Sequence, residues 1–220
     1  MPTRTNVDRG SLRGTSDREL ELGGFSPNGE RHICAFFHDK DEEYQILLPF
    51  IADGIRNGEK AIHLIDENYR EVHTRRLKEG GIDVRRAAES GQLEIRGWGD
   101  AYLHRGRFDL DAMLAIIEAL LDGAREQGYR RTRLVADMAW ALMNRPGVRD
   151  LIAYEARLNA LLDGRDDVVV CVYDLTRFGG AIVMDVMKTH PLAVVSGVMQ
   201  HNPFYIAPRE MLRELDRRTE

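Results

Sequence analysis

The sequence predicts an α/β fold in three layers, in which helices flank a mostly parallel sheet of about six strands. From residue 31 onward, short apolar runs alternate with longer amphipathic stretches, and strands joined by crossover helices build parallel sheets. One run, Val168–Val172, is apolar without interruption, as expected of a strand that helices cover on both faces. Together these observations define the fold class.

Each strand is predicted from a short apolar run and each helix from a longer amphipathic segment. The clearest helix follows Asp109, which can cap its first turn, and ends before Gly128. Pro146 suits the first turn of another helix, and Gly164 suits its exit. The predicted strands are 31–37, 60–66, 93–98, 132–139, 167–174 and 192–199. The predicted helices are 40–57, 68–79, 83–90, 109–127, 146–163 and 179–189, with a short charged helix near the C-terminus.

Composition and charge exclude several classes of function. Hydrophobic residues make up 43% of the 220 positions and charged residues 30%, so a packed core is expected. The net charge of −5 argues against direct binding of nucleic acid. No apolar run approaches the roughly 20 residues of a membrane span, and the first thirty residues lack a signal-peptide core. We therefore expect a cytoplasmic protein without a membrane partner.

The chain is expected to contain a single folded unit. Residues 1–30 show no sustained period and are predicted to be a disordered tail. Residues 31–210 are predicted to form the domain, and residues 211–220 a helical end. No pattern predicts the oligomeric state.

The first predicted strand leads directly into a helix, as it does around a phosphate-binding loop. Such a loop needs glycines whose backbone N–H groups face the phosphates, a lysine, and a hydroxyl group for magnesium. The turn from Phe37 to Glu43 contains no glycine and no Lys-Ser or Lys-Thr pair, and it carries four acids. Conventional ATP hydrolysis is therefore not expected.

Acidic and aromatic side chains gather after the predicted strands, where ligands of open parallel sheets usually bind. Aromatic residues would form the walls of a pocket there, and the acids would orient polar groups of a ligand. The acids can also be explained as helix caps, and the two tryptophans as plugs of the space that a phosphate loop would occupy. The candidates are His38, Asp66, Glu67, Trp98, Asp137, Met138, Trp140, Tyr173 and Asp174.

The order of the segments resembles a RecA/KaiC-like core, in which Asp137 would take the place of a Walker-B aspartate. A closer resemblance covers roughly residues 31–210, and several short segments carry it. These are His32–Phe37, Phe50–Gly54 with Gly58-Glu59, Asp137–Trp140, Tyr154–Asn159, Cys171–Asp174, Thr189–Pro191 and Asn202–Tyr205. In these segments the chain resembles the MEDS family of sensory domains.

The resemblance implies a KaiC-like fold without the nucleotide loop, used as a ligand-sensing input module. Hydrocarbon-derived ligands have been suggested for the family. Many relatives attach the domain to a helix-turn-helix or a histidine kinase, for which this chain has no room, so its output would require a separate partner. The candidate residues that come with the family motifs are His32, Cys34, Glu59, His190 and Pro191.

Glu155 is an anomaly on the predicted helix 146–163, because it falls inside the apolar stripe of that helix. Asn159 follows one turn later. A buried carboxylate is costly unless it is hydrogen-bonded or paired. Two explanations remain open: a structural bond to the backbone or to a histidine such as His32 or His190, or a direct contact of Glu155 and Asn159 with a ligand.

The two cysteines, Cys34 and Cys171, exclude a disulfide framework and a four-cysteine zinc site. His32 and Cys34 share one face of a predicted strand, so a site that combines cysteine and histidine ligands is conceivable. No close-spaced ligand pair of the CxxC type is present, however, and buried free cysteine behaves mostly as a small apolar residue. We therefore predict core cysteines, no metal site and no cofactor. Nor does His190 have a recognisable nucleophile partner, so no catalytic residue is predicted.

These observations predict a non-enzymatic sensory module that binds a small, mostly apolar molecule. It would relay the signal to a histidine kinase, a transcription regulator or an anti-sigma partner. An alternative from another class is a degenerate nucleotide-binding enzyme that keeps Glu67 and Asp137 for metal and water. A third is a pure protein-interaction domain whose pocket is filled by side chains.

Overall fold

The computed structural model describes Leu22 and residues 29–219, so almost all of the expected tail, residues 1–30, lies outside the described part. The described strands form one sheet in the order β3-β2-β4-β5-β1-β6-β7. Neighbouring strands run parallel except for β6 and β7, which are antiparallel. The strands are β1 (His32–Phe37), β2 (Lys60–Ile65), β3 (Leu93–Gly97), β4 (Thr132–Asp137), β5 (Val168–Asp174), β6 (Leu192–Val195) and β7 (Val198–His201).

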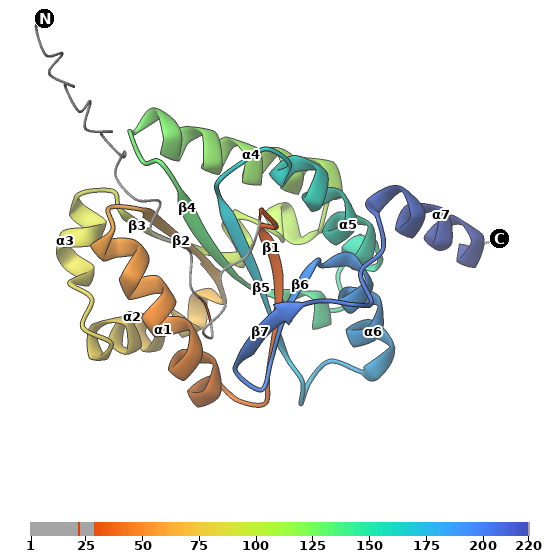
Figure 1. Ribbon diagram of the computed structural model, residues 1–220, viewed down its shortest axis with the longest axis horizontal. Helices are drawn as coiled ribbons and strands as arrows, with labels where there is room; N and C mark the ends of the chain where they lie inside the picture. The colour runs from red at the N-terminus through yellow and green to blue at the C-terminus, as the bar shows by residue number, and fades with distance from the viewer. Residues whose placement is uncertain (1–21, 23–28, 220) are drawn as a thin grey trace, which may run out of the picture.

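Helices cover both faces of the sheet, which gives the three predicted layers (Figure 1). The first three helices pack on one face, and the next three pack on the other. The helices are α1 (Lys40–Arg56), α2 (Arg70–Glu79), α3 (Val84–Glu89), α4 (Leu110–Glu126), α5 (Leu151–Leu162), α6 (Gly180–Thr189) and α7 (Pro208–Thr219).

Alternation along β1 divides its side chains between two cores, because successive residues of a strand point to opposite faces. Ile33, Ala35 and Phe37 pack with the α1–α3 layer, whereas Cys34 and Phe36 pack with the α4–α6 layer. The register pairs Cys34 with Cys171 and Phe36 with Tyr173 on β5. Polar and sulfur-bearing residues of β1 and β5 are thereby directed toward α5 and α6.

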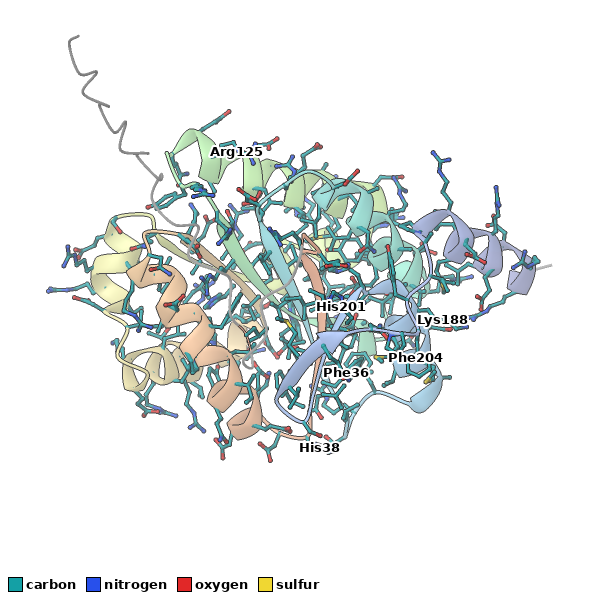
Figure 2. The ribbon with its side chains drawn as sticks, viewed as in Figure 1. Phe36, His38, Arg125, Lys188, His201 and Phe204 are labelled. Carbon is teal, nitrogen blue, oxygen red and sulfur yellow. The ribbon has the colours of Figure 1, made fainter. Side chains whose placement is uncertain are left out.

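The parallel strands give the sheet two distinct edges, which we call the amino edge and the carboxyl edge. His38 directly follows β1 and therefore marks the carboxyl edge, at the bottom of Figure 2. His201 is the last residue of the antiparallel strand β7. In the same view it lies above His38, toward the amino edge (Figure 2). The two edges carry different candidate sites.

The prediction of a single last strand over 192–199 is wrong. The chain instead folds into a hairpin of β6 and β7, which raises the number of strands in the sheet from about six to seven. Ser196 and Gly197 form the turn, with φ angles of 50° and 75°. A left-handed backbone at both central residues is what a two-residue type I′ turn requires.

The helix predicted over 146–163 begins later than expected. Gly147 has a φ of 86° and precedes a 3₁₀ turn at Val148–Asp150, after which α5 begins. The carbonyl of Pro146 accepts a hydrogen bond from the backbone N–H of Phe108 at 2.9 Å. Pro146 therefore lies in a loop that is tied to the segment before α4, and not in the first turn of a helix.

The C-terminal helix α7 packs against α5 and α6, and it begins at Pro208, before the predicted boundary at 211. The ammonium group of Lys188 on α6 donates to Glu214 at 2.8 Å. Arg218 on α7 donates to Asp185 on α6 at 2.6 Å. In the part of the chain that the structure describes, no helix combines the length and apolar character needed to cross a bilayer.

Candidate functional site

Four polar side chains converge between β1, β5, α5 and α6. We call His32, Glu155, Cys171 and His190 the buried cluster. None of them is more than 1% exposed, and one nitrogen, oxygen or sulfur atom of each lies within 4.8 Å of the corresponding atom of the others. Strands β1 and β5 supply His32 and Cys171, helix α5 supplies Glu155, and His190 follows α6.

Glu155 lies at the centre of the buried cluster. Its Oε2 atom is 3.2 Å from His32 Nε2, 3.6 Å from His190 Nε2 and 3.6 Å from Cys171 Sγ. Its Oε1 atom accepts a hydrogen bond from the Tyr173 hydroxyl group at 2.5 Å. The acid that stood out in the sequence thus meets both histidines that were considered as its partners.

Asn159 determines which nitrogen of His32 carries the proton. The Asn159 amide nitrogen donates to the carbonyl of Thr189 at 2.7 Å and to that of Glu155 at 3.1 Å. Its Oδ1 atom therefore faces His32 Nδ1, 3.3 Å away, as an acceptor. With the proton on Nδ1, His32 directs the lone pair of Nε2 into the buried cluster.

His190 is oriented in the same way. Its Nδ1 atom lies 2.9 Å from the carbonyl oxygen of Val186, and because a carbonyl can only accept, Nδ1 carries the proton. The opposite nitrogen, Nε2, is buried and has no hydrogen-bond partner. Two imidazole lone pairs therefore point at the same carboxylate oxygen of Glu155.

Burial favours the uncharged form of each member of the buried cluster. It lowers the pKa of His32 to about 3, against the hydrogen bond to Asn159, which opposes this shift. Burial, together with His32, lowers the pKa of His190 to about 3. Burial also raises the pKa of Glu155 and, with the help of Glu155, that of the Cys171 thiol. The histidines are therefore neutral at pH 7.

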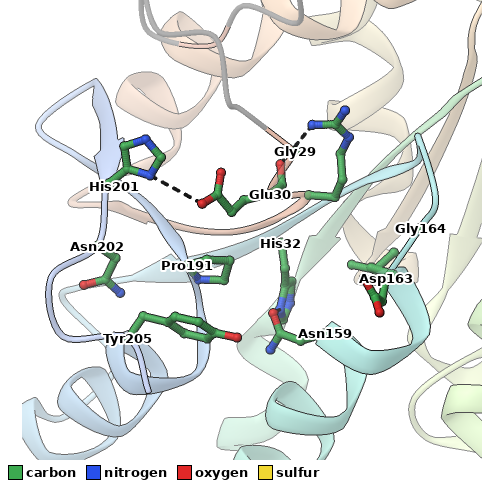
Figure 3. A pocket seen from close by; sticks show the side chains of 12 residues that line it. Gly29, Glu30, His32, Asn159, Asp163, Gly164, Pro191, His201, Asn202 and Tyr205 are labelled. Carbon is green, nitrogen blue, oxygen red and sulfur yellow. Dashed lines mark hydrogen bonds and ion pairs between the residues drawn. The ribbon is translucent and has the colours of Figure 1, made fainter. Parts of the chain in front are cut away.

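A pocket of about 470 Å³ opens at the amino edge, and His32 belongs to its lining (Figure 3). Figure 3 shows Asn159 beside the His32 ring and the Tyr205 hydroxyl group directed toward this pair. Glu30 closes one side through an ion pair with His201 at 3.7 Å. The complete lining is Gly29, Glu30, Arg31, His32, Asn159, Leu162, Asp163, Gly164, Pro191, His201, Asn202 and Tyr205.

The carboxyl edge is filled by an ion network. Lys40 donates to Glu43 at 2.7 Å and to Asp137 at 3.1 Å. The cavity beside these residues has a volume of only about 20 Å³, whereas pockets for small organic ligands usually measure roughly 300–1,000 Å³. Burial raises the pKa of Glu43 to about 7, against the opposing effect of Lys40. This network occupies the place where a phosphate loop would hold a nucleotide.

The acids predicted at the carboxyl edge accept backbone N–H groups. Asp66, Asp137 and Asp174 each accept the N–H group two residues further along the chain, at 2.9 Å. Glu67 accepts the backbone N–H of Trp98 at 3.1 Å. Their interpretation as caps and turn-forming residues accounts for these contacts. His38 lies at the same edge with an exposed ring, 3.3 Å from Glu42.

The predicted aromatic walls belong to the interior of the protein. Trp140 is fully buried and stacks on Tyr102 with ring centroids 4.5 Å apart. Trp98 is 7% exposed, and its indole N–H donates to the carbonyl of Asp137 at 3.0 Å. Met138 is also fully buried, and Tyr173 contacts Glu155 instead of an open crevice. A ligand would reach the Trp140 ring only if the core opened.

The remaining family-motif residues have different surroundings. Glu59 pairs with the buried guanidinium group of Arg133 at 2.5 Å and with Arg131 at 3.0 Å, and so connects the start of β2 to β4. Cys34 lies 3.5 Å from the carbonyl of Leu192, outside the buried cluster. Pro191 lines the amino-edge pocket.

Sequence reasoning missed the pocket at the amino edge. Glu30, Asp163, His201 and Tyr205 had not been considered as site residues, and the rule for parallel sheets pointed to the opposite edge. The sequence nevertheless contained one indication of this pocket, because the segment Asn202–Tyr205 is among those that carry the family resemblance. Two of its members, Asn202 and Tyr205, line the pocket.

Comparison with known proteins first defines the class of fold. A KaiC-like protein of the hyperthermophilic archaeon Pyrococcus horikoshii superposes with a TM-score of 0.56 at 18% sequence identity, covering 80% of this chain and 75% of that one. At this level of identity, the similarity shows a shared fold. The predicted KaiC-like α/β architecture is confirmed.

The family follows from a match over most of the chain. The family model described as the MEthanogen/methylotroph, DcmR Sensory domain (MEDS) matches residues 31–191, and this chain belongs to that family. The transcriptional repressor DcmR of Methylorubrum extorquens is 26% identical over 173 residues, which are 78% of this chain. The alignment spans 62% of the repressor, less than two thirds of its length.

Proposed function

We propose that this chain is a non-enzymatic sensory domain that binds a small, partly polar molecule in the amino-edge pocket, whose lining is mostly polar. The observation that carries the proposal is the pocket itself, whose volume of about 470 Å³ lies within the usual range for small-molecule sites. The family assignment supports a sensory role. A polar group of the ligand would contact the side chains of His32, Asn159 and Tyr205.

The absence of enzymatic activity is part of the same proposal. Asp39 caps α1 by accepting the backbone N–H of Glu42 at 2.8 Å, and Glu42 in turn accepts the N–H of His38 at 2.8 Å. Backbone donors that a phosphate loop would offer to a nucleotide are thus used by acidic side chains, which repel phosphate. Lys40, the lysine of this turn, is paired with two carboxylates.

A signal from the pocket would travel through α5 and α6. His32 contacts Asn159 of α5, and Asn159 donates to the carbonyl of Thr189 at the end of α6. Both helices contact α7. A shift of the His32 ring would therefore change the surface formed by these three helices, which we propose as the contact for a separate regulatory partner such as a histidine kinase, a transcription regulator or an anti-sigma protein.

The test is to map ligand binding by NMR on the ¹⁵N-labelled full chain. The probes are alcohols, aldehydes and chlorinated alkanes of one to four carbons, each titrated separately. We expect the largest shifts at the backbone amides of the pocket lining, near Glu30–His32 and Asn202–Tyr205, and little change at the Trp140 indole N–H. The variant Asn159→Leu should weaken binding, whereas Trp140→Phe should not. Shifts centred on Lys40 and Asp137, or binding that depends on Trp140, would contradict the proposal.

A further inference from the structure

We propose that His32, Glu155, Cys171 and His190 bind one divalent transition-metal ion of the Zn²⁺ type. The site goes beyond the ligand pocket proposed above, because it lies behind His32 in the interior and its four donor atoms come from four different elements of the fold. Four observations carry it: the spacing of the donor atoms, the orientation of both imidazoles, the His190 Nε2 atom that lacks a partner, and the balance of charge.

The spacing matches a tetrahedral ion. Zn²⁺ binds nitrogen and oxygen at roughly 2.0–2.2 Å and thiolate sulfur at roughly 2.3 Å, so its four ligand atoms lie about 3.3–3.8 Å from one another. The two Glu155 Oε2 to histidine Nε2 distances are 3.2 and 3.6 Å. The Cys171 sulfur lies 3.5 Å from His32 Nε2 and 3.6 Å from Glu155 Oε2. Three of the six edges of the tetrahedron thus fall within this range, a fourth is about 0.1 Å shorter, and the other two are no longer than 4.8 Å.

The imidazoles are oriented as metal ligands are. A ligating histidine usually donates its second ring N–H to a backbone carbonyl or another oxygen, which directs the free lone pair at the ion. His190 makes this bond to the Val186 carbonyl, and His32 makes it to the Asn159 amide oxygen. Glu155 is held in turn by the Tyr173 hydroxyl group, which donates to Oε1, whereas both histidines lie closest to Oε2.

Hydrogen bonds among the four residues do not satisfy the buried cluster. The Cys171 thiol lies 3.5 Å from His32 Nε2 and can donate to it, but no donor among the described residues lies within hydrogen-bond distance of His190 Nε2. His190 is itself fully buried, with an exposure of 0%. A cation at the centre of the buried cluster would satisfy both Nε2 lone pairs at once.

The charges also balance. A divalent cation bound by the Glu155 carboxylate and the Cys171 thiolate, with two neutral imidazoles, has a net charge of zero. A neutral group of this kind suits an interior in which an isolated charge would be costly. Metal binding would release the carboxyl and thiol protons, and His32, which lines the amino-edge pocket, would separate the ion from solvent and offer a path for its entry.

Cys34 provides a matched control inside the same layer. It pairs with Cys171 across β1 and β5 and is equally buried, yet its sulfur faces the Leu192 carbonyl and Met187. If a metal binds, substitution of Cys171 should change its binding and substitution of Cys34 should not. If both cysteines are only apolar core residues, the two substitutions should have similar effects.

The experiment uses the full chain, freed of metal by a chelator and titrated with Co²⁺ and then with Zn²⁺. We expect one equivalent of Co²⁺ to produce intense tetrahedral d–d absorption and a thiolate-to-cobalt charge-transfer band, and Zn²⁺ to displace it and raise the Tm. Cys171→Ser should lose the charge-transfer band, Cys34→Ser should keep it, and His190→Gln should weaken Co²⁺ binding at least tenfold.

Two results would overturn the proposal. One is a wild-type chain, folded by circular dichroism, that binds no Co²⁺ at a tenfold excess. The other is a charge-transfer band that persists in folded Cys171→Ser. Neither result would move the ligand shifts that test the amino-edge pocket, so failure of the metal site and failure of the proposed function can be told apart.

Discussion

The polar side chains at the two edges of the sheet differ in whether they have a partner of opposite charge. At the carboxyl edge, Lys40 lies between the acids Glu43 and Asp137, and its side chain is 36% exposed. Beneath the amino edge, Glu155 lies between two histidines that are buried and neutral. The first group contains its own counter-charge, and the second contains none.

This difference indicates which edge depends on something outside the protein. Opposite charges at the carboxyl edge satisfy one another and leave a cavity of about 20 Å³, so no ligand is required there. In the buried cluster, lone pairs face a carboxylate, and a much larger pocket adjoins it. Substitutions at the two edges should therefore change the free energy of unfolding by different amounts, and these changes should respond differently to metal and to pH.

The largest effect is expected for Glu155→Leu. Leucine cannot accept the Tyr173 hydroxyl group or contact the two imidazoles, and each buried polar group left unpaired costs about 1–3 kcal/mol. We expect the free energy of unfolding of the chelator-treated chain to fall by about 3 kcal/mol or more. Urea denaturation measures this difference.

Glu155→Gln is the matched control for this prediction. Glutamine can still accept from Tyr173, and its amide group can donate to one imidazole, so the expected loss in the same buffer is about 1 kcal/mol. Equal losses for the two variants, or a stabilised Glu155→Leu, would show that the carboxyl group is not held by these bonds.

A smaller, pH-dependent effect is expected for Glu43→Gln. The pKa of Glu43 is raised to about 7 in the folded protein, above the value in an unfolded chain, so the folded state binds more protons between about pH 4.5 and 7. The stability contributed by protonated Glu43 is therefore lost as pH rises through this window. Glutamine cannot ionise, and it should stabilise the chain by about 1–2 kcal/mol at pH 8 and hardly at all at pH 4.

Thermal melts at a series of pH values check this prediction. Glu71→Gln on the exposed face of α2 is the control and should show no such dependence. If Glu43→Gln instead lost stability at pH 8, the pairing of Glu43 with Lys40 would outweigh the effect of burial.

The fold could be predicted because its signals are local. Apolar runs and helix periodicity define β1 to β5 and the helices between them, and each boundary depends on residues close by. The last strand could not be predicted as two, because apolar residues dominate the whole segment Leu192–Met199 and the two-residue turn interrupts them only briefly. Ser196 has a left-handed backbone there, a conformation that serine as a residue type does not predict.

The candidate site could be predicted only in part, because its geometry is not local. Glu155 stood out, since a carboxylate interrupts an apolar stripe, and both histidines were considered beside it. A site that combines cysteine and histidine ligands was conceivable, but Cys171 and Cys34 were both predicted to be core residues. The ligands proposed for the metal are separated by 16 to 158 residues along the chain, so no motif spacing could reveal them, and the sequence analysis predicted no metal site.

The smallest effect is expected at Asp137, the residue that matched a Walker-B acid in position. Its Oδ1 atom accepts the N–H of Ala139, and its Oδ2 atom pairs with a partly exposed Lys40. An asparagine can keep the first bond, and Lys40 keeps Glu43, so Asp137→Asn should cost at most about 1 kcal/mol. In an assay of phosphate release from magnesium–ATP, wild type and Asp137→Asn should be equally inactive, because acids occupy the turn where a nucleotide would need N–H groups and a free lysine. Turnover by the wild type that disappears in a folded Asp137→Asn variant would move the functional site to the carboxyl edge and reverse the contrast between the two edges.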